Sequence, residues 1–421
     1  MPGEAARRIL IVGLNYAPEE IGIGRYTSSL AERLVERGYE VEVVAGKPYY
    51  PQWSVYPQFR NLRWEHATEA GVGIVRCPHY VPARPTGLRR IAHLASFAAT
   101  ALGPAVARAL RSRARRPQIV LCVAPALMSV PVAWLAARLA GAKLWVHVQD
   151  FEVEAAFATA LLDGKSRSAR MARALERRIL GLADRVSSIS PQMCARLVDK
   201  GVPPARVFEL RNWADERVHP CDSASNPYRI EWGLGAARIA LYSGNIANKQ
   251  GIEIVVEAAR LLAHRRDIVF IVCGEGPNRE NLEAIGQGLE NLQFHDLQPS
   301  ERMNDLLALA SVHLLPQIPG AADLVLPSKL TNMLASARPV VATAAPDTGL
   351  YDEVAGCGLC TPPGDAAAFA AAIERLVDDN SLRADLGSAA ASRAAEVWSG
   401  RRIVDRLEQT LAAMVAVPPP S

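Results

Sequence analysis

One pattern occurs twice in this sequence: apolar runs that end at a glycine alternate with amphipathic stretches. The first copy reads RILIVGLNYAP, SSLAERLVERG and YEVEVVAG, and a second copy starts after residue 225 with RIALYSGNI, GIEIVVEAARLLAHR and IVFIVCGEG. Continuous apolar runs indicate strands that are buried on both faces of a parallel sheet, and helices usually connect such strands. The repeat therefore predicts an α/β protein with two doubly wound, Rossmann-like domains.

The length of the chain agrees with two domains. Its 421 residues exceed the roughly 250–300 at which one hydrophobic core usually divides. We place the hinge near NWADERVHPCDSASNP, with the first domain over residues 1–215 and the second over 216–395. Residues 396–421 form a last helix and tail that could pack back on the first domain. Because ligands of open parallel sheets lie beyond the carboxyl ends of the strands, we expect the site in the cleft that the domains face.

Positive charge is concentrated in the first half of the chain. Residues 1–210 contain 29 Lys and Arg against 17 Asp and Glu, whereas the remainder contains 18 against 26. Residues 70–149 contain no acid, and such a field suits an anionic surface. The alternative is a solvated basic helix face. We predict that an anionic membrane surface, or a molecule held at that surface, contacts six arginines: Arg89, Arg90, Arg111, Arg113, Arg115 and Arg116.

The apolar stretch IAHLASFAATALGPAVARAL, residues 91–110, is too short for a membrane span. Arg108 and the internal Gly103-Pro104 interrupt it, and it falls below the roughly 20 apolar residues that a span needs. We expect an interfacial or buried helix pair there.

The cysteines and the start of the sequence favour the reducing cytosol. The chain has seven cysteines, an odd number that cannot all pair in disulfides within one chain. The start, MPGEAARRILIVGLNY, leads into a strand without the long apolar segment of a signal peptide. Cys357 and Cys360 have C-x-x-C spacing, but no second pair accompanies them, so we interpret them as part of a loop and a strand. No metal, other cofactor or nucleic-acid partner is expected. The predicted location is the cytoplasm, peripheral on the inner face of the plasma membrane.

Four loops that follow predicted strands have the small or polar residues of an anion site. In YAPEEIGIGRYT, Gly22 and Gly24 let bare backbone approach a phosphate at the start of a helix. In YSGNIANKQG, Gly244, Asn245 and Lys249 could present amides, a carboxamide and a positive charge to one anion. If each loop is considered alone, a structural alternative explains it equally well: a tight glycine turn in the first loop and an ordinary surface lysine in the second.

The other two loops are CGEGPNRENL, with Gly274 directly after a strand, and AADLVLPSKLTNML. In the second of these, Ser328 could cap a helix while Lys329 and free amides bind an anion. A helix cap without a ligand is the alternative. Four such loops in two matched domains predict one phosphorylated ligand.

The order of these motifs resembles that of the retaining glycosyltransferases of family four, which have the GT-B fold. The similar stretches include GIGRYT, SISPQMCARLVDKGVPPARVFELRNWAD, YSGNIANKQGIEIVVEAA, VCGEGPNRENLE and LPSKLTNMLASARPVVAT, so the resemblance covers nearly the whole chain. Within that family, YAPEEIGIGRYT, KPYYPQW, HVQDFEVEA and GAADLVLPSKLTN look most like the colanic-acid fucosyltransferase type of exopolysaccharide assembly.

The resemblance implies a nucleotide diphosphate sugar as donor, bound mainly by the second domain. Asn245 stands where the family has an arginine, and Lys249 or Gln250 stands where it has a lysine. Leu324 and Asn332 stand where many members have two glutamates. Asp323 could replace the first glutamate, and the amide oxygen of Asn332 could accept hydrogen bonds from ribose. The resemblance thus implies donor contacts by Gly22, Gly24, Gly244, Asn245, Lys249, Gly274, Asp323, Leu326, Ser328, Lys329 and Asn332.

Two residues are our candidates for catalysis. Asp150, in WVHVQDFEVEAA, follows a strand of the first domain and could contact the acceptor or the transferred sugar, with a helix cap as the alternative. Lys249 would stabilise the leaving diphosphate. His147 alternates with apolar neighbours and is expected to be a core histidine.

The resemblance implies retaining transfer to a lipid-pyrophosphate-linked oligosaccharide, with GDP-fucose as the first choice of donor and UDP-sugars next. A nucleotide-sugar 2-epimerase of GT-B architecture and a non-catalytic relative that binds nucleotide sugars are the alternatives.

Overall fold

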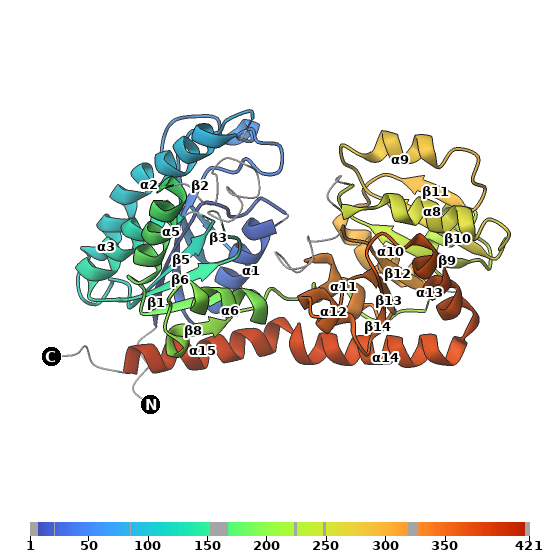
Figure 1. Cartoon of the computed structure of the whole chain (residues 1–421). Helices are drawn as coiled ribbons and strands as arrows, with labels where there is room; N and C mark the ends of the chain where they lie inside the picture. The colour runs from blue at the N-terminus through green and yellow to red at the C-terminus, as the bar shows by residue number, and fades with distance from the viewer. Residues whose placement is uncertain are drawn as a thin grey trace. The chain divides into compact units, whose positions relative to one another are not determined.

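The chain forms two compact units, each with a sheet and flanking helices (Figure 1). The computed structural model describes residues 7–20, 22–84, 86–125, 127–151, 167–222, 225–246, 250–318 and 327–416. The first unit comprises Met1–Arg211 together with Val404–Ser421, and the second comprises Asn212–Ile403.

The first unit is built on a sheet with strand order β3-β4-β2-β1-β5-β6-β7-β8. Neighbouring strands pair in parallel, except that β3 is antiparallel to β4. The central β1 is buried from its second residue onward because helices cover the sheet. The strands are β1 Arg8–Gly13, β2 Glu40–Gly46, β3 Glu65–Glu69, β4 Val72–Cys77, β5 Ile119–Ala124, β6 Lys143–Val148, β7 Arg185–Ser188 and β8 Val207–Glu209.

Helices α2 and α3 lie side by side over one face of this sheet (Figure 1). Their apolar side chains form one core with alternate residues of β1, β5 and β6, as the side-chain period of two requires. Helix α1 buries its apolar residues outside this core and contacts β2 and β4. The helices of the unit are α1 Gly22–Glu36, α2 Gly87–Ala109, α3 Val130–Ala140, α5 Arg167–Leu180, α6 Pro191–Asp199 and the part of α15 (Gly400–Ala416) from Val404 onward.

The expected helix pair over residues 91–110 is wrong, because α2 continues unbroken through Pro104. A proline inside a helix removes the N–H that would bond the carbonyl four residues earlier. That carbonyl belongs to Thr100, and the indole Nε1 of Trp64 donates to it at 3.0 Å. Phe97 and Ala101 hold the same helix on the sheet. A side chain from another segment thus replaces the missing backbone donor.

The second unit contains a sheet with strand order β11-β10-β9-β12-β13-β14, in which the paired strands are all parallel. The chain order reverses between β9 and β12, which is where open parallel sheets usually bind their ligands. The strands are β9 Arg238–Ser243, β10 Ile268–Cys273, β11 Leu292–His295, β12 Val312–Leu315, β13 Val340–Thr343 and β14 Gly358–Thr361.

Helices cover both faces of the second sheet. Helices α8 and α13 share one apolar core with β9, β10 and β12, while α11, α12 and α14 pack around β13 in another. The two cysteines with C-x-x-C spacing are free: Cys360 lies in β14 and Cys357 just before it, as predicted. The helices are α7 Pro227–Glu231, α8 Glu253–Leu261, α9 Arg279–Ile285, α10 Met303–Leu309, α11 Lys329–Ala335, α12 Gly349–Val354, α13 Ala366–Asp378 and α14 Asn380–Val397.

The six arginines that we predicted to form one contact surface lie at two opposite edges of the first sheet. Helix α2 starts after the carboxyl end of β4 and ends before the amino end of β5, so its two ends lie at opposite edges of the sheet. Its 23 residues span about 34 Å. Arg89 and Arg90 lie at the carboxyl edge, whereas Arg111, Arg113, Arg115 and Arg116 follow the other end of the helix.

The side chains of two of the six arginines have intramolecular partners among the described residues. Arg111 donates to the Glu42 carboxylate on β2, and the guanidinium of Arg90 lies 6.0 Å from the centre of the Trp53 ring. No helix within the described ranges is both long enough and apolar enough to span a bilayer.

Candidate active site

Lys329 brings a buried positive charge, with no hydrogen-bond partner in the described part of the chain, to the carboxyl edge of the second sheet. It is the first residue of α11, and its Nζ atom lies 3.9 Å from the centre of the Tyr242 ring near the end of β9. A Cβ atom on Gly244, the residue after β9, would be 3.7 Å from the same Nζ. Among the described residues, Nζ is buried and has no hydrogen-bond partner.

Burial makes this ammonium group electrostatically unusual. Removal from water lowers the pKa of Lys329 to about 7 from its ordinary 10.5. The face of the Tyr242 ring offers partial compensation, but a buried charge without a counter-ion costs free energy. An anionic group bound here would pair with the ammonium and restore its pKa. This position is therefore suited to a phosphate or a carboxylate of a ligand.

The loops after β9 and β10 are joined backbone to backbone beside Lys329. The amide of Ile246 donates to the carbonyl of Glu275 at 2.8 Å, and the amide of Gly244 donates to the carbonyl of Cys273 at 2.9 Å. A Cβ atom on Gly274 would lie 2.0 Å from the Gly244 oxygen. Glycine is thus required at 274 because the two loops approach so closely.

Asn245 also lies in this group of loops. The Tyr242 hydroxyl is 2.6 Å from both the Asn245 carbonyl oxygen and Gln250 Oε1, so it ties the loop to its own strand. The side-chain oxygen of Asn245 faces Gly276, where an added Cβ would come within 2.8 Å. The structure thus brings Gly244, Asn245, Gly274 and Lys329 together at one edge of the second sheet.

Two predicted contacts around α11 have other roles in this structure. Ser328 makes no side-chain cap bond within the described residues, so the expected cap is wrong; its carbonyl instead accepts a bond from Thr331 Oγ1 at 2.9 Å. Asn332 Oδ1 accepts the backbone N–H of Asp215 at 2.8 Å. A carbonyl oxygen has a second lone pair, so the predicted ribose contact of Asn332 stays a prediction.

Several predicted residues lie outside the described ranges. These are Lys249 in the loop after β9, and Asp323, Leu324 and Leu326 in the segment before α11. Their assignments remain those made from the sequence.

A buried carboxylate organises the glycine loop of the first unit. Glu19, which is 2% exposed, accepts the amides of Tyr49 and Tyr50 on Oε1 at 2.9 Å each, and Asn15 Nδ2 on Oε2 at 2.9 Å. Burial raises the pKa of this carboxyl, while the three hydrogen bonds oppose the rise. Glu19 therefore links the segment before α1 to the loop after β2.

The two predicted glycines of that loop differ in their surroundings. Gly22, the exposed first residue of α1, has a φ of 65°, a left-handed conformation that favours glycine. At Gly24 a Cβ atom would lie 2.8 Å from Glu19 Cβ and 2.9 Å from Glu19 Oε2. Close packing on Glu19 is thus a structural reason for glycine at 24, beside the predicted approach to a phosphate.

Asp150 follows β6 at the carboxyl edge of the first sheet, where the prediction places it. His147, within β6, is 3% exposed and shares a hydrogen bond of 2.9 Å between Nδ1 and Ser187 Oγ. Burial lowers the pKa of His147 to about 4, so this histidine is neutral near pH 7. The expectation of a core histidine is confirmed, and Asp150 is the second residue after this strand.

Sequence reasoning missed Tyr242 and Glu19. Tyr242 could have been noticed as the aromatic residue just before a Ser-Gly-Asn turn, and Glu19 as an acid between Pro18 and the glycine loop. Neither signal identifies a partner from sequence. Among the described residues, no three His, Cys, Asp or Glu side chains are grouped to hold a metal ion.

Two family models match most of the chain. A glycosyl transferase 4-like domain matches residues 22–213, and a glycosyl transferases group 1 domain matches residues 237–379. The putative colanic acid biosynthesis glycosyl transferase WcaI of Escherichia coli K12 is 38% identical over 88% of this chain and 92% of its own length.

Solved structures share the whole two-unit architecture. Sucrose-phosphate synthase from Thermosynechococcus elongatus superposes with a TM-score of 0.70 at 20% identity, covering 97% of this chain and 99% of its own. HepE from Anabaena, in complex with UDP and glucose, superposes with a TM-score of 0.68 at 16% identity, covering 97% of this chain and 100% of its own.

The two parallel-sheet units define a glycosyltransferase fold of the GT-B class, as predicted. The chain belongs to glycosyltransferase family four, and it is a transferase enzyme.

Proposed function

We propose that this enzyme transfers one sugar from a nucleotide diphosphate sugar to a lipid-pyrophosphate-linked oligosaccharide during exopolysaccharide assembly. The observation that carries the donor part is the buried Lys329 ammonium beside Gly244, which has no hydrogen-bond partner within the described ranges. Support also comes from two proteins that this chain resembles: the putative colanic acid biosynthesis glycosyl transferase WcaI, and HepE, which was solved in complex with UDP-glucose. GDP-fucose remains the first choice of donor, followed by UDP-sugars.

Lys329 would act on the leaving group. As the bond from the sugar carbon C1 to the diphosphate oxygen breaks, its electron pair moves to the diphosphate, and negative charge builds there. A fixed ammonium in a site of low dielectric stabilises this charge more than water does. Because the lysine supplies positive charge, we propose that the reaction needs no metal ion or other cofactor. Lys249 is proposed to assist from the loop after β9.

Transfer with retention follows from attack on the same face of the sugar. The acceptor hydroxyl oxygen forms the new bond to C1, and its proton passes to an oxygen of the departing diphosphate. No nucleophilic side chain is required in this scheme. Asp150 would accept a hydrogen bond from the acceptor or the transferred sugar and so position it.

A nucleotide panel tests the proposal. Thermal unfolding of the wild type and Lys329→Ala would be followed with GDP, UDP, ADP and their sugars, since a ligand specific to the folded state raises the unfolding temperature. We expect one base to stabilise the wild type and to lose most of this effect in Lys329→Ala. Asp150→Asn should keep the shift but transfer about 10²–10⁴-fold more slowly. A wild type that no nucleotide stabilises would overturn the proposal.

A further inference from the structure

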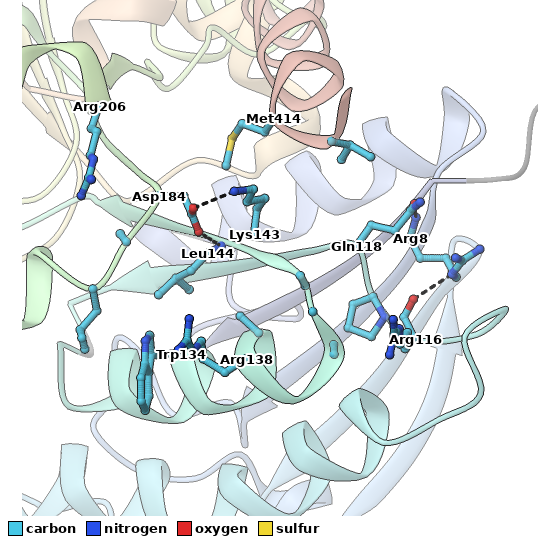
Figure 2. A pocket seen from close by; sticks show the side chains of 18 of the residues that line it. Arg8, Arg116, Gln118, Trp134, Arg138, Lys143, Leu144, Asp184, Arg206 and Met414 are labelled. Atoms are coloured by element: carbon cyan, nitrogen blue, oxygen red, sulfur yellow. Dashed lines mark hydrogen bonds and ion pairs between the residues drawn. The ribbon is translucent and has the colours of Figure 1, made fainter. Parts of the chain in front are cut away.

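A large basic groove runs along the amino edge of the first sheet, the edge opposite Asp150. Figure 2 shows it between α3, the starts of β1 and β6, and the end of α15. Its volume is about 810 Å³, a size within the range of small-molecule sites. In an open parallel sheet the substrate lies beyond the other edge, so the donor and acceptor do not account for this groove.

The groove gathers cations from segments that lie far apart in the sequence: Arg8, Arg113, Arg116, Arg138, Lys143 and Arg206. Among its described lining residues, Asp184 is the one acid. Asp184 pairs with Lys143 Nζ at 3.2 Å and accepts the backbone amide of Leu144 at 2.9 Å, so its charge is already used. The lining therefore keeps a large excess of positive charge.

Strand order explains why these cations form a line. Arg8 begins β1, Lys143 begins β6, and Arg206 directly precedes β8. These strands occupy one side of the sheet in the order β1-β5-β6-β7-β8. Four steps of about 4.8 Å place the ends of the row roughly 19 Å apart. In Figure 2, Arg206 and Arg116 lie at the two sides of the view, with Lys143 between them.

Two guanidinium groups are available for a ligand. The backbone of Arg116 is fixed because its carbonyl accepts Arg8 Nε at 2.9 Å, and one terminal nitrogen of its guanidinium passes 3.8 Å from the Cβ position of Gly141. Among the described residues, no carboxylate pairs with the side chain of Arg116 or with that of the exposed Arg206. One guanidinium group can donate two parallel hydrogen bonds to the oxygens of a phosphoryl group, and most cations of this row are arginines.

We propose that this groove binds a linear small molecule that carries at least two phosphoryl groups. Such a ligand would lie along the row of strand starts, with one phosphoryl group near Arg116 and another near Lys143 or Arg206. The proposal concerns a free small molecule, because the cations line a concave groove instead of a flat face. It is independent of the proposed donor site at Lys329, a residue of the second unit.

Inorganic tripolyphosphate titrated into the full chain by calorimetry tests the groove. We expect two sites in the wild type, one in the groove and one at Lys329. The double variant Arg116→Ala/Arg206→Ala should weaken the groove site tenfold or more, and Lys329→Ala should remove the other. The double variant Arg63→Ala/Arg266→Ala removes two exposed arginines elsewhere and should keep both sites.

Equal binding by the groove variant and its control would overturn the proposal. It would also be overturned if the groove variant lost binding to phosphatidylserine vesicles while keeping the tripolyphosphate site, since the cations would then serve a membrane. Arg206→Ala alone, at an exposed turn, provides the same comparison if the double variant does not fold. If the wild type binds tripolyphosphate in the groove but not at Lys329, the proposed donor site is contradicted and the groove proposal is not.

Discussion

The ammonium of Lys329 lies 3.9 Å from the centre of the Tyr242 ring and has no acceptor among the described residues. An aromatic face attracts a cation, but it does not neutralise it as a carboxylate would. Tyr242 is itself held, because its hydroxyl lies 2.6 Å from the Asn245 carbonyl oxygen. The pair thus keeps a positive charge ready at the sheet edge at some cost in stability.

Lys329→Met should stabilise the protein while abolishing donor binding. The thioether fills similar space without a charge to desolvate, so we expect the free energy of unfolding at pH 6 to rise by about 1–4 kcal/mol. Urea unfolding and nucleotide titration would measure the two effects. Lys143→Met removes a partly exposed lysine paired with Asp184 and should change stability by less than about 1 kcal/mol. A destabilised Lys329→Met protein would contradict the interpretation.

Nucleotide binding should weaken as the pH rises above neutrality. Burial lowers the pKa of Lys329 to about 7, so above that pH the free protein carries a neutral amine, and an anion must bind together with a proton. We expect the Kd of the preferred nucleoside diphosphate to rise up to tenfold per pH unit between about 7 and 9. The guanidinium of Lys329→Arg stays charged and should flatten the profile. A flat wild-type profile would count against a buried ammonium.

The same pKa shift predicts how stability depends on pH. Between pH about 7 and 10.5 the unfolded chain keeps a proton on Lys329 that the folded chain has lost. Because the unfolded state then binds more protons, the contribution of this residue to stability rises with pH across that window. Lys329→Met should lack this rise when unfolding free energies of the two proteins are compared at pH 7 and pH 9.

The sequence predicted most of the buried strands but not the edge strand β3. Strands such as β1, β5, β9 and β10 are continuous apolar runs because both their faces are covered. Strand β3 reads EHATE and contains no fully buried residue, so its pairing with β4 leaves no apolar pattern to find. The unbroken α2 was missed for another reason: Pro104 is tolerated because Trp64 bonds the freed carbonyl of Thr100.

In the candidate site, too, the sequence indicated single residues but not their partners from distant segments. Lys329 could be selected from its turn, because a lysine at a helix start after a strand is typical of anion sites. Its ring partner Tyr242, and the Glu19 that packs on Gly24, come from distant segments whose contacts depend on the fold. Glycine was thus recognised at 24 without the structural reason that requires it.

Gly24→Ala should destabilise the first unit. The added methyl group would meet Glu19 Cβ at 2.8 Å and Glu19 Oε2 at 2.9 Å, and moving Glu19 would disturb its bonds to the Tyr49 and Tyr50 amides. We expect a loss of about 1–3 kcal/mol in thermal or urea unfolding. Gly103→Ala is the matched control: this helical glycine has nothing within 4 Å of its Cβ position, so alanine should be neutral or stabilising by up to about 1 kcal/mol.

A double-mutant cycle separates the contact from other effects of residue 24. Glu19→Ala alone should be destabilising, because it leaves buried amides without an acceptor. If the contact explains Gly24, adding Gly24→Ala to Glu19→Ala should cost clearly less than adding it to the wild type. Strictly additive losses would show that Glu19 is not what excludes a side chain at 24.

Membrane association is predicted to use the Arg89 end of α2, not the Arg113 end. The proposed acceptor would have to reach the carboxyl edge of the sheet, and there Leu88 and Ile91 are 82% and 52% exposed beside Arg89 and Arg90. Exposed apolar side chains next to basic side chains are typical of a helix that contacts a membrane interface. Each basic residue near an anionic surface contributes about 1 kcal/mol.

Sedimentation with phosphatidylserine vesicles compares the two ends of the helix. Arg89→Glu/Arg90→Glu should weaken binding roughly 30-fold or more, and the remaining binding should fall with added salt because screening shortens the field. Arg113→Glu/Arg115→Glu changes the net charge by the same amount, but at the amino edge of the sheet. Its affinity for the vesicles should stay within about threefold of that of the wild type. Equal losses would mean that net charge alone attracts the protein. A larger loss at Arg113 and Arg115 would place the membrane at the edge opposite Asp150, which a lipid-linked acceptor could not use.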